Sequence, residues 1–522
     1  MADGKQVFRE FKLHGLTLHS DALKKLLAEL SSQPGLHLED VIFAIKNSID
    51  RSKLKTTVVS QEALESALDT LLSVSRENDY ESIQVFSAFE QPQLKYHPST
   101  KTYEVSVDPT RKMHGTAKHR LNLFRDRFSS VERRVRRHKT FSKPVGGATA
   151  GSSDGYLDLS KIESLLGVTG TKRVLGMLGQ DERKRVFLED LTSRIFLDLT
   201  EAKCTNGLFG ANCSVLVEGQ VVDDIFHVET MGLPPPETRL DSLAVLGGVD
   251  PLGVEVSAMQ REQIVEMEQN QELYSFVVLS DVHLDDAEVM KHLDILFSGY
   301  EPFRPTLFIF MGNFSSTPVG YGHGVEVMGI MDLKQNFDKL ATMLLKYPDL
   351  VEHSKFVFVP GPSDPGAPDV LPRHPLPSVC TEDFLRRIPS AIMTTNPCRI
   401  RYFTKDLVIM RDDTQQKMSR SCLVPIAYDD ENFDMPKHLV KTIIDEGHLC
   451  PMPLSIRPIH WAYDSAMHLF PLPNVLILAD KTESFLVKYA DVVVFHPGPF
   501  FVDYSFDLYR PLSNTVESSK IE

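Results

Sequence analysis

The sequence predicts a multidomain protein with a small all-α domain at the N-terminus, a β-barrel in the middle and an α/β domain at the C-terminus. Three patterns indicate this order. Helical amphipathic spacing dominates the first 75 residues, short alternating strands fill 160–255, and continuous apolar strands alternate with helices in 271–522. At 522 residues the chain is also long enough for two to four domains.

Composition and cysteine usage exclude several classes of protein. No apolar stretch approaches the roughly 20 residues that cross a bilayer, and the start, MADGKQVFREFK, carries charges where a signal peptide is apolar. We therefore expect an intracellular protein with no membrane association. No zinc site and no cofactor are expected, because no C-x-x-C pair occurs among the six cysteines at positions 204, 213, 380, 398, 422 and 450.

Residues 1–75 are expected to form a helical docking domain. SDALKKLLAEL begins with a Ser20 and Asp21 cap and places its leucines on one face. LEDVIFAIKNSI and SQEALESALDTLL repeat that spacing. Amphipathic helices without a catalytic cluster favour a module that binds other proteins, and the alternative is a stabilising appendage.

Residues 76–155 are predicted to be a linker with a basic segment at 111–143. Twelve Lys and Arg against Asp126 and Glu132 give this segment a charge of +10, whereas the whole chain carries −15 and the remainder therefore −25. Only this segment could hold a nucleic-acid backbone. The alternatives are a solvated, partly helical spacer and a nuclear address. The candidate contacts to nucleic acid or a partner are Arg133, Arg134, Arg136 and Arg137.

Residues 156–260 are predicted to form an OB-type β-barrel, since about five short strands with turn residues between them are typical of that size. LEDLTSRIFLDL indicates a hairpin with Thr192 and Ser193 at the bend. Phe187, Phe196 and Phe226 could stack on nucleic-acid bases. Several acidic neighbours make core filling the favoured interpretation.

Residues 271–522 are predicted to form an α/β domain. The strands SFVVLS, TLFIFM, KFVFVP, NVLILA and DVVVFH are continuous apolar runs of the kind buried on both faces of a sheet. Chemistry in such a sheet gathers at the carboxyl ends of the strands. These ends read SDVHLD, MGNFSS, PGPSDP and HPGPF.

The order of these motifs resembles the calcineurin-like metallophosphoesterases. Active members carry D-x-H, then G-D, then G-N-H-[DE], and their Asp and His side chains hold two metal ions. Asp281 and His283 match the first motif, and Asp364 matches the end of the third. Asn313 replaces the bridging aspartate, and Ser363 replaces the histidine.

Loss of the anionic bridge is a severe change. Two divalent ions roughly 3.5–4 Å apart repel by on the order of 18 kcal/mol at an effective dielectric of about 20. We therefore expect an inactive phosphoesterase domain with no catalytic residue and no bound metal, whose vestigial positions are Asp281, His283, Asn313, Ser363 and Asp364. The alternatives at Asp281 and His283 are a single weakly held metal, or a mutual hydrogen bond that fixes the loop.

The combination of helical head, basic segment, barrel and eroded phosphoesterase resembles the B-subunit family of replicative DNA polymerases. The barrel motifs VLGMLGQ and IFHVETMGLPPPETR and the series FVVLSDVHLD, FIFMGNFSS and FVFVPGPSDP carry the resemblance. It implies a non-catalytic nuclear subunit for DNA replication and repair. The implied partners are the cysteine-rich C-terminal module of the polymerase catalytic subunit and other replisome components. Any zinc or iron–sulfur centre would then be bound by that C-terminal module.

Two other functions remain open from the sequence. Asp281, His283 and Asp364 would serve a metal-dependent phosphodiesterase or 3′–5′ exonuclease, the activity of archaeal relatives with an intact metal site. The barrel and the basic segment would serve a single-stranded DNA-binding protein. Weak DNA contact within an assembled polymerase complex is compatible with the scaffold interpretation.

Overall fold

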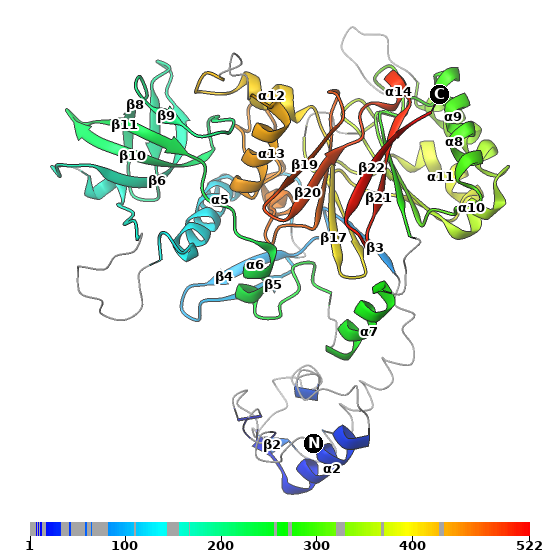
Figure 1. Ribbon diagram of the computed structural model, residues 1–522, viewed down its shortest axis with the longest axis horizontal. Helices are drawn as coiled ribbons and strands as arrows, with labels where there is room; N and C mark the ends of the chain where they lie inside the picture. Colours follow the sequence, from blue (N-terminus) through cyan, green and yellow to red (C-terminus); the bar gives the residue numbers. More distant parts are fainter. Residues whose placement is uncertain are drawn as a thin grey trace. The chain divides into compact units, whose positions relative to one another are not determined.

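The computed structural model describes two compact units of the chain. The first comprises 1–84, 254–272 and 402–404, and the second comprises 85–253, 273–401 and 405–522. Figure 1 gives the element labels used below. The described residues are 7, 9, 11–12, 17–32, 41–42, 58–59, 64, 82–108, 111–142, 156–165, 167–254, 258–269, 274–319, 329–366, 370–426 and 433–521.

The first unit contains one of the helices predicted for the N-terminal domain. That helix is α2 (Ser20–Ser32), and Ala22 and Leu26 on its inner face are buried with Phe11. Strands β1 (Thr17–Leu18) and β2 (Val58–Val59) pair in parallel, which adds a small ladder to the expected all-α domain. The other two predicted helices fall largely outside the described residues. Helix α7 (Ala258–Gln269) also belongs to this unit, so the predicted barrel boundary at residue 260 lies too far along the chain.

The predicted barrel is present in the second unit. Its strands follow the order β10-β6-β7-β8-β11, and β11 pairs with β10 to close the ring. The predicted hairpin is the β7–β8 pair, with Thr192 and Ser193 in its turn. Its strands are β6 (Lys172–Gln180), β7 (Val186–Glu189), β8 (Arg194–Asp198), β10 (Ser214–Val222) and β11 (Ile225–Gly232), with η1 (Ile162–Ser164) before them and β9 (Lys203–Cys204) on the edge.

The barrel interior is filled by alternate apolar residues of these strands, including Val174, Leu188 and Phe226. Phe226 is therefore a core residue, as expected. Phe187 and Phe196 are half-buried, and each lies beneath a guanidinium, that of Arg194 at 5.6 Å and that of Arg185 at 4.1 Å from the ring centroid. These two rings pack against cations of the barrel itself.

The α/β domain is built on two six-stranded sheets. All five apolar runs that the sequence identifies are strands: β12, β13 and β14 in one sheet, β18 and β20 in the other. The first sheet is ordered β15 (Ala391–Met393), β14 (Lys355–Val359), β13 (Leu307–Met311), β12 (Phe276–Ser280), β21 (Ser505–Arg510) and β22 (Thr515–Lys520). The second is ordered β19 (Phe485–Tyr489), β20 (Val492–His496), β18 (Val475–Ala479), β17 (Lys405–Arg411), β16 (Cys398–Tyr402) and β3 (Ile83–Ser87).

Helices cover the outer face of each sheet, as Figure 1 shows. Alternate residues of β12 to β14 pack against α8, α9 and α11, whereas those of β17, β18 and β20 pack against α13. Strands β12, β13, β18 and β20 are buried at all five positions, which explains their nearly continuous apolar sequences. The helices are α6 (Arg239–Leu246), α8 (Ala287–Tyr300), α9 (Ile330–Leu344), α10 (Pro348–His353), α11 (Ser378–Arg387), α12 (Thr414–Arg420), α13 (Met435–Glu446), η2 (Trp461–Met467) and α14 (Phe500–Asp503).

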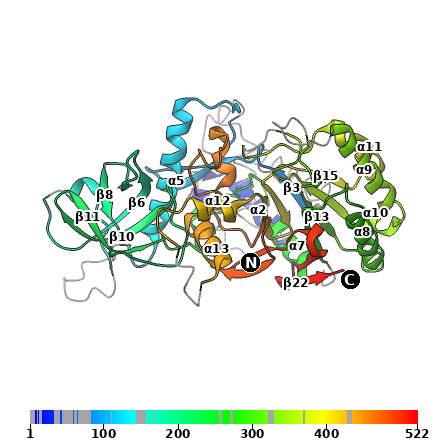
Figure 2. The same cartoon turned by 90° about the horizontal axis from the view of Figure 1, so that it is seen from above.

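The predicted linker is the main error of the sequence interpretation. Residues 82–106 form β3 and the hairpin β4 (Gln93–His97) and β5 (Thr102–Ser106), and the basic segment contains α5 (Ala117–Arg137). Phe128, Val131 and Val135 of α5 are buried with Leu175 of the barrel. Figure 2 shows α5 between the barrel and the α/β domain. The helix is structural because its apolar face and two of its arginines are buried.

Candidate functional site: the carboxyl edge of the sheets and the cleft beside α5

The five positions that the sequence analysis predicts to be vestigial lie at one edge of the first sheet. Asp281 and His283 follow β12, Asn313 follows β13, and Ser363 and Asp364 follow β14. These three strands are neighbours and run in parallel, so their carboxyl ends meet. The structure thus brings together the residues that the motifs single out.

Asp281 is bound by a guanidinium from the other sheet. Arg411, the last residue of β17, donates from Nη2 to Oδ1 of Asp281 at 2.9 Å and from Nε to Oδ2 at 3.1 Å. The backbone N–H and the side-chain Nδ2 of Asn313 also donate to Oδ1, at 3.0 and 2.9 Å. Both members of the ion pair are at most 1% exposed. The Asp281 carboxylate therefore joins the two sheets where a metal ligand would stand.

Two neighbouring carboxylates stabilise the positive charge of Arg411. Burial disfavours the charged guanidinium, but the carboxylates of Asp281 and Asp413 outweigh burial and raise the pKa of Arg411 above its ordinary value. Arg411 reaches Asp413 through Nη1 at 2.9 Å. Sequence reasoning missed this residue, although Arg411 directly follows the apolar run LVIM of β17.

Asn313, Ser363 and Asp364 connect neighbouring loops. Oδ1 of Asn313 accepts from the Ser363 N–H at 2.8 Å. The two oxygens of Asp364 accept from the N–H groups of Phe314 and Gly361, at 2.8 and 2.7 Å. Burial raises the pKa of Asp364 to about 6, although those two backbone donors favour the charged form. These side chains are engaged by the protein's own backbone.

The two histidines of the motifs are also engaged. His283 stacks on Phe501 with ring centroids 4.2 Å apart, and burial lowers the pKa of His283. His496 ends β20 and is fully buried. Its Nε2 lies 3.0 Å from the Thr482 carbonyl, and its Nδ1 accepts from the Gly498 N–H at 3.3 Å, which assigns the proton to Nε2. Burial lowers the pKa of His496 to about 4, so the ring is neutral at physiological pH.

This donor set does not fit a two-metal centre. A divalent ion within about 4 Å of the Arg411 guanidinium would be repelled by on the order of 8 kcal/mol at an effective dielectric of about 20. Asn313 supplies a neutral amide at the bridging position, and both nitrogens of His496 are occupied by hydrogen bonds. The expected alternative, a hydrogen bond between Asp281 and His283, is replaced by the Asp281–Arg411 pair and the stacked imidazole.

The four candidate contact arginines have different environments. Arg134 is 7% exposed and donates to the backbone oxygen of Asp445, so its guanidinium is engaged within the chain. Arg137 makes a two-bond pair with Glu237 at 2.7 and 2.8 Å. Arg136 pairs with Glu132 of the same helix, and Arg133 lies 4.8 Å from the ring centroid of Tyr96. Each therefore has a role within the chain.

A buried ionic cluster fastens α5 to the α/β domain. Arg127 donates from Nε to Oδ2 of Asp464 at 3.1 Å, and Nε2 of His448 and of His468 lie 3.3 and 3.1 Å from its carboxylate. Burial alone would raise the pKa of Asp464, but Arg127 and His448 hold it well below its usual range. Burial and the charge of Arg127 lower the pKa of His448 to about 3. The two histidines and Asp464 have metal-ligand spacing, yet a guanidinium already satisfies the carboxylate.

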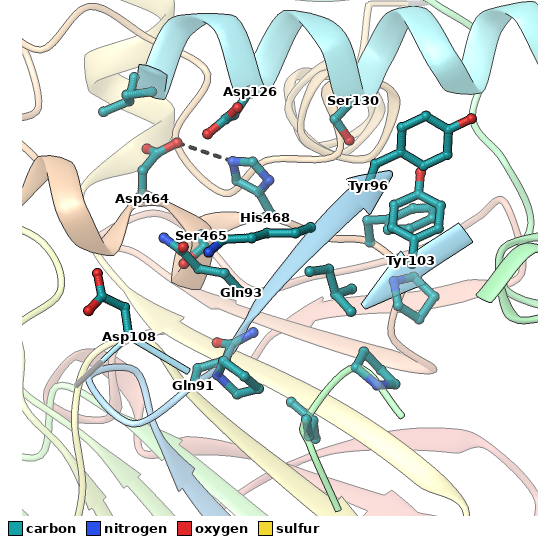
Figure 3. Close-up of a pocket in the computed structure, with 18 of the residues that line it drawn as sticks. Gln91, Gln93, Tyr96, Tyr103, Asp108, Asp126, Ser130, Asp464, Ser465 and His468 are labelled. Atoms are coloured by element: carbon teal, nitrogen blue, oxygen red, sulfur yellow. Dashed lines mark hydrogen bonds and ion pairs between the residues drawn. The ribbon is translucent and has the colours of Figure 1, made fainter. Parts of the chain in front are cut away.

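A cleft of about 690 Å³ opens beside this cluster. Its walls come from β4, α5 and η2, and Figure 3 shows Asp126 and Ser130 on α5 together with Asp464 and His468. Sequence reasoning did not find this cleft, because η2 lies more than 300 positions from β4 and α5 along the chain.

Three parts of the chain match known families. Residues 276–487 match the DNA polymerase alpha/epsilon B-subunit family, 117–235 match the OB-fold domain of DNA polymerase epsilon subunit 2-like proteins, and 4–71 match DNA polymerases epsilon N terminal. The second match confirms the OB-fold domain. It begins at the first residue of α5, which agrees with the packing of that helix on the barrel.

Curated relatives match over nearly the whole chain. DNA polymerase epsilon subunit 2 of Homo sapiens is 36% identical over 98% of this chain and 97% of the relative. The DNA polymerase epsilon B-subunit of Arabidopsis thaliana is 34% identical over 99% and 98%. That of Schizosaccharomyces pombe is 32% identical over 84% and 76%.

A solved archaeal phosphodiesterase aligns at 9% identity and a TM-score of 0.27, over 47% of this chain and 99% of its own. Structural similarity at this level gives no information about activity. None of the helices in the described parts of the chain has the length and apolarity that crossing a membrane requires.

Proposed function

Because the chain belongs to the family of DNA polymerase epsilon subunit 2, also called the B-subunit, and is thus an accessory subunit of that polymerase, we propose that it acts without chemistry of its own. The Asp281–Arg411 ion pair carries this proposal. A guanidinium offers only hydrogen-bond donors, so it can neutralise the carboxylate but cannot activate a water as a metal would.

The proposed partner is the cysteine-rich C-terminal module of the catalytic subunit of DNA polymerase epsilon. The barrel and the α/β domain form the grip in this proposal, and the N-terminal domain links the complex to other replisome components. The proposed site of action is the nucleus, in DNA replication and repair. Support comes from the family matches, which extend over all three regions of the chain.

Binding to the catalytic subunit is tested by co-expression. The full chain is produced with a tagged C-terminal fragment of the catalytic subunit, and the two are expected to co-purify at equal stoichiometry through size exclusion. A fragment whose metal-binding cysteines are changed to serine is the control and should not retain the chain. Separation of the chain from the intact fragment would overturn the partner assignment.

Absence of chemistry is tested with manganese and bis(p-nitrophenyl) phosphate. We expect no metal-dependent turnover by the purified chain or the complex. Turnover that requires manganese and disappears in Asp281→Asn would establish the phosphodiesterase or exonuclease alternative instead. The single-stranded DNA alternative gains no specific support, because Phe187 and Phe196 pack under arginines of the barrel and Arg134 is buried.

A further inference from the structure

The cleft beside α5 contains a strand whose outer edge has no neighbour among the described residues. Strand β4 pairs with β5 alone, in a two-stranded sheet with the register Gln93↔Ser106 to His97↔Thr102. A strand directs alternate N–H and C=O groups to its two sides. Half of the backbone hydrogen-bonding groups of β4 therefore point away from β5. A two-stranded hairpin is also marginal by itself and gains stability from a third strand.

This free edge faces the cleft. All five consecutive residues of β4 line it, whereas β5 contributes Tyr103 alone. A strand that presented one face would contribute alternate residues, because successive side chains point to opposite faces. Contribution of every residue means that the edge of β4 borders the cleft. Figure 3 shows the side chains of Gln93 and Tyr96 there, with His468 between α5 and β4.

The cleft is basic although the chain as a whole is acidic. Six Lys or Arg side chains line it against four Asp, in a chain of net charge −15. Two of the four carboxylates are already paired with arginines, Asp464 with Arg127 and Asp406 with Arg401 and Arg239. The cleft therefore has a surplus of positive charge.

Several of these cations make no hydrogen bond to a carboxylate among the described residues. The hydrogen-bond partners of Arg399 are neutral oxygens, Oε1 of Gln91 at 3.0 Å and the backbone oxygens of Ala466 and His468. Nε of Arg133 and Nε and Nη2 of Arg111 are buried atoms without a hydrogen-bond partner in the described part of the chain. These arginines add to the positive charge of the cleft, which an acidic ligand would offset.

We propose that an extended, acidic segment of a partner protein adds to the free edge of β4 inside this cleft. The main chain of the segment continues the β4–β5 sheet, and Asp or Glu at alternate positions face Lys95 and the arginines of the walls. This is strand addition, in which backbone hydrogen bonds give affinity and side chains give selectivity. Five residues of such a segment span about 17 Å. The proposal goes beyond the proposed function and does not depend on it.

The test uses the full chain and a fluorescent peptide of sequence EVEVEVE with blocked termini. Fluorescence anisotropy is expected to show saturable binding, and hydrogen exchange at residues 93–97 is expected to slow when the peptide is present. N-methylation of alternate peptide nitrogens removes the backbone donors but retains the charge, and it should abolish binding. The peptide KVKVKVK should not bind.

Lys95→Glu reverses an exposed charge on β4 and should weaken binding about five- to tenfold. Its control is Lys291→Glu on α8, which is also exposed but lies outside the cleft, and which should leave binding unchanged. Equal binding of the N-methylated peptide, equal loss in both variants, or no binding would overturn the proposal. So would β4 amides that are already protected without peptide, because the chain itself would then cover the edge. The co-expression result with the catalytic subunit is independent of all these outcomes.

Discussion

Removal of the Arg411 guanidinium is the sharpest test of how the carboxyl edge is held together. Arg411→Met keeps most of the side-chain volume but leaves the buried carboxylate of Asp281 without its cation. Asp413 loses a donor at the same time. We expect the second unit to be destabilised by about 3–5 kcal/mol, the range for breaking one side of a buried, hydrogen-bonded ion pair.

The structure offers a control with similar geometry and different burial. Arg510 of β21 also makes two hydrogen bonds to one carboxylate, that of Glu517, at 3.2 and 3.1 Å. These side chains are 45% and 55% exposed, against 0% and 1% for Arg411 and Asp281. Arg510→Met should therefore cost at most about 1 kcal/mol. Because each arginine makes two hydrogen bonds to one carboxylate, the difference in destabilisation between the two variants reports the effect of burial.

Urea unfolding followed by tryptophan fluorescence and circular dichroism measures both costs. With an m-value of about 3 kcal/mol/M, Arg411→Met should lower the midpoint by roughly 1 M or more. The double variant Arg411→Met with Asp281→Asn removes both charges, and it should recover about 2 kcal/mol of the loss. If Arg411→Met cost no more than Arg510→Met, the carboxylate would be hydrated, and the account of this edge as a dry ion pair would be refuted.

Three further perturbations test other parts of the structure. Arg127→Met leaves Asp464 buried beside two histidines, and hydrogen exchange across α5 should accelerate by at least a hundredfold, because a loss of about 3 kcal/mol exceeds two powers of ten; unchanged exchange would contradict the role of this pair. Gly312→Ala should destabilise by about 2 kcal/mol or more, since its Cβ would overlap a buried carboxylate oxygen, whereas Gly299→Ala in α8 meets nothing within 4 Å and should stabilise by about 0.5–1 kcal/mol. His496 has a pKa of about 4 in the folded protein, so between about pH 6.5 and 4 the unfolded chain binds one more proton at this residue. The free energy of unfolding therefore decreases by about 1.4 kcal/mol for each unit by which the pH is lowered. His496→Gln keeps a donor and an acceptor and should reduce that slope by one proton in urea titrations at pH 7, 6 and 5; an unchanged slope would assign it to other groups.

The elements that the sequence predicts correctly are those whose buried residues are close together along the chain. The runs at 276–280, 307–311 and 355–359 are apolar on both faces, so consecutive apolar residues are enough to predict that these strands are buried. The barrel strands alternate with period two and are found for the same reason. The motif SDVHLD also places Asp281 correctly at a strand end, because the order of motifs follows the order of strands.

The parts that sequence reasoning missed depend on partners far along the chain. Arg127 meets Asp464 at a separation of 337 residues, and Arg411 meets Asp281 at 130. A basic helix is identical in sequence whether its arginines face solvent or a buried carboxylate, so the segment around α5 is interpreted as a linker. Strands β4 and β5 are short and carry polar residues, since they pair in a two-stranded sheet and do not cross a core.

The two buried arginine clusters follow one physical rule. Asp281 and Asp464 each lie among side chains of metal-ligating types, and in each case the neutralising charge is an arginine from a distant element. A carboxylate in a dry interior needs a cation, and either a metal ion or a guanidinium can meet that need. The guanidinium has no open coordination position, so it fixes the two elements that it joins and leaves no electrophile for a substrate. An arginine at such an edge therefore favours rigidity over reactivity, which agrees with the proposed role as a binding subunit.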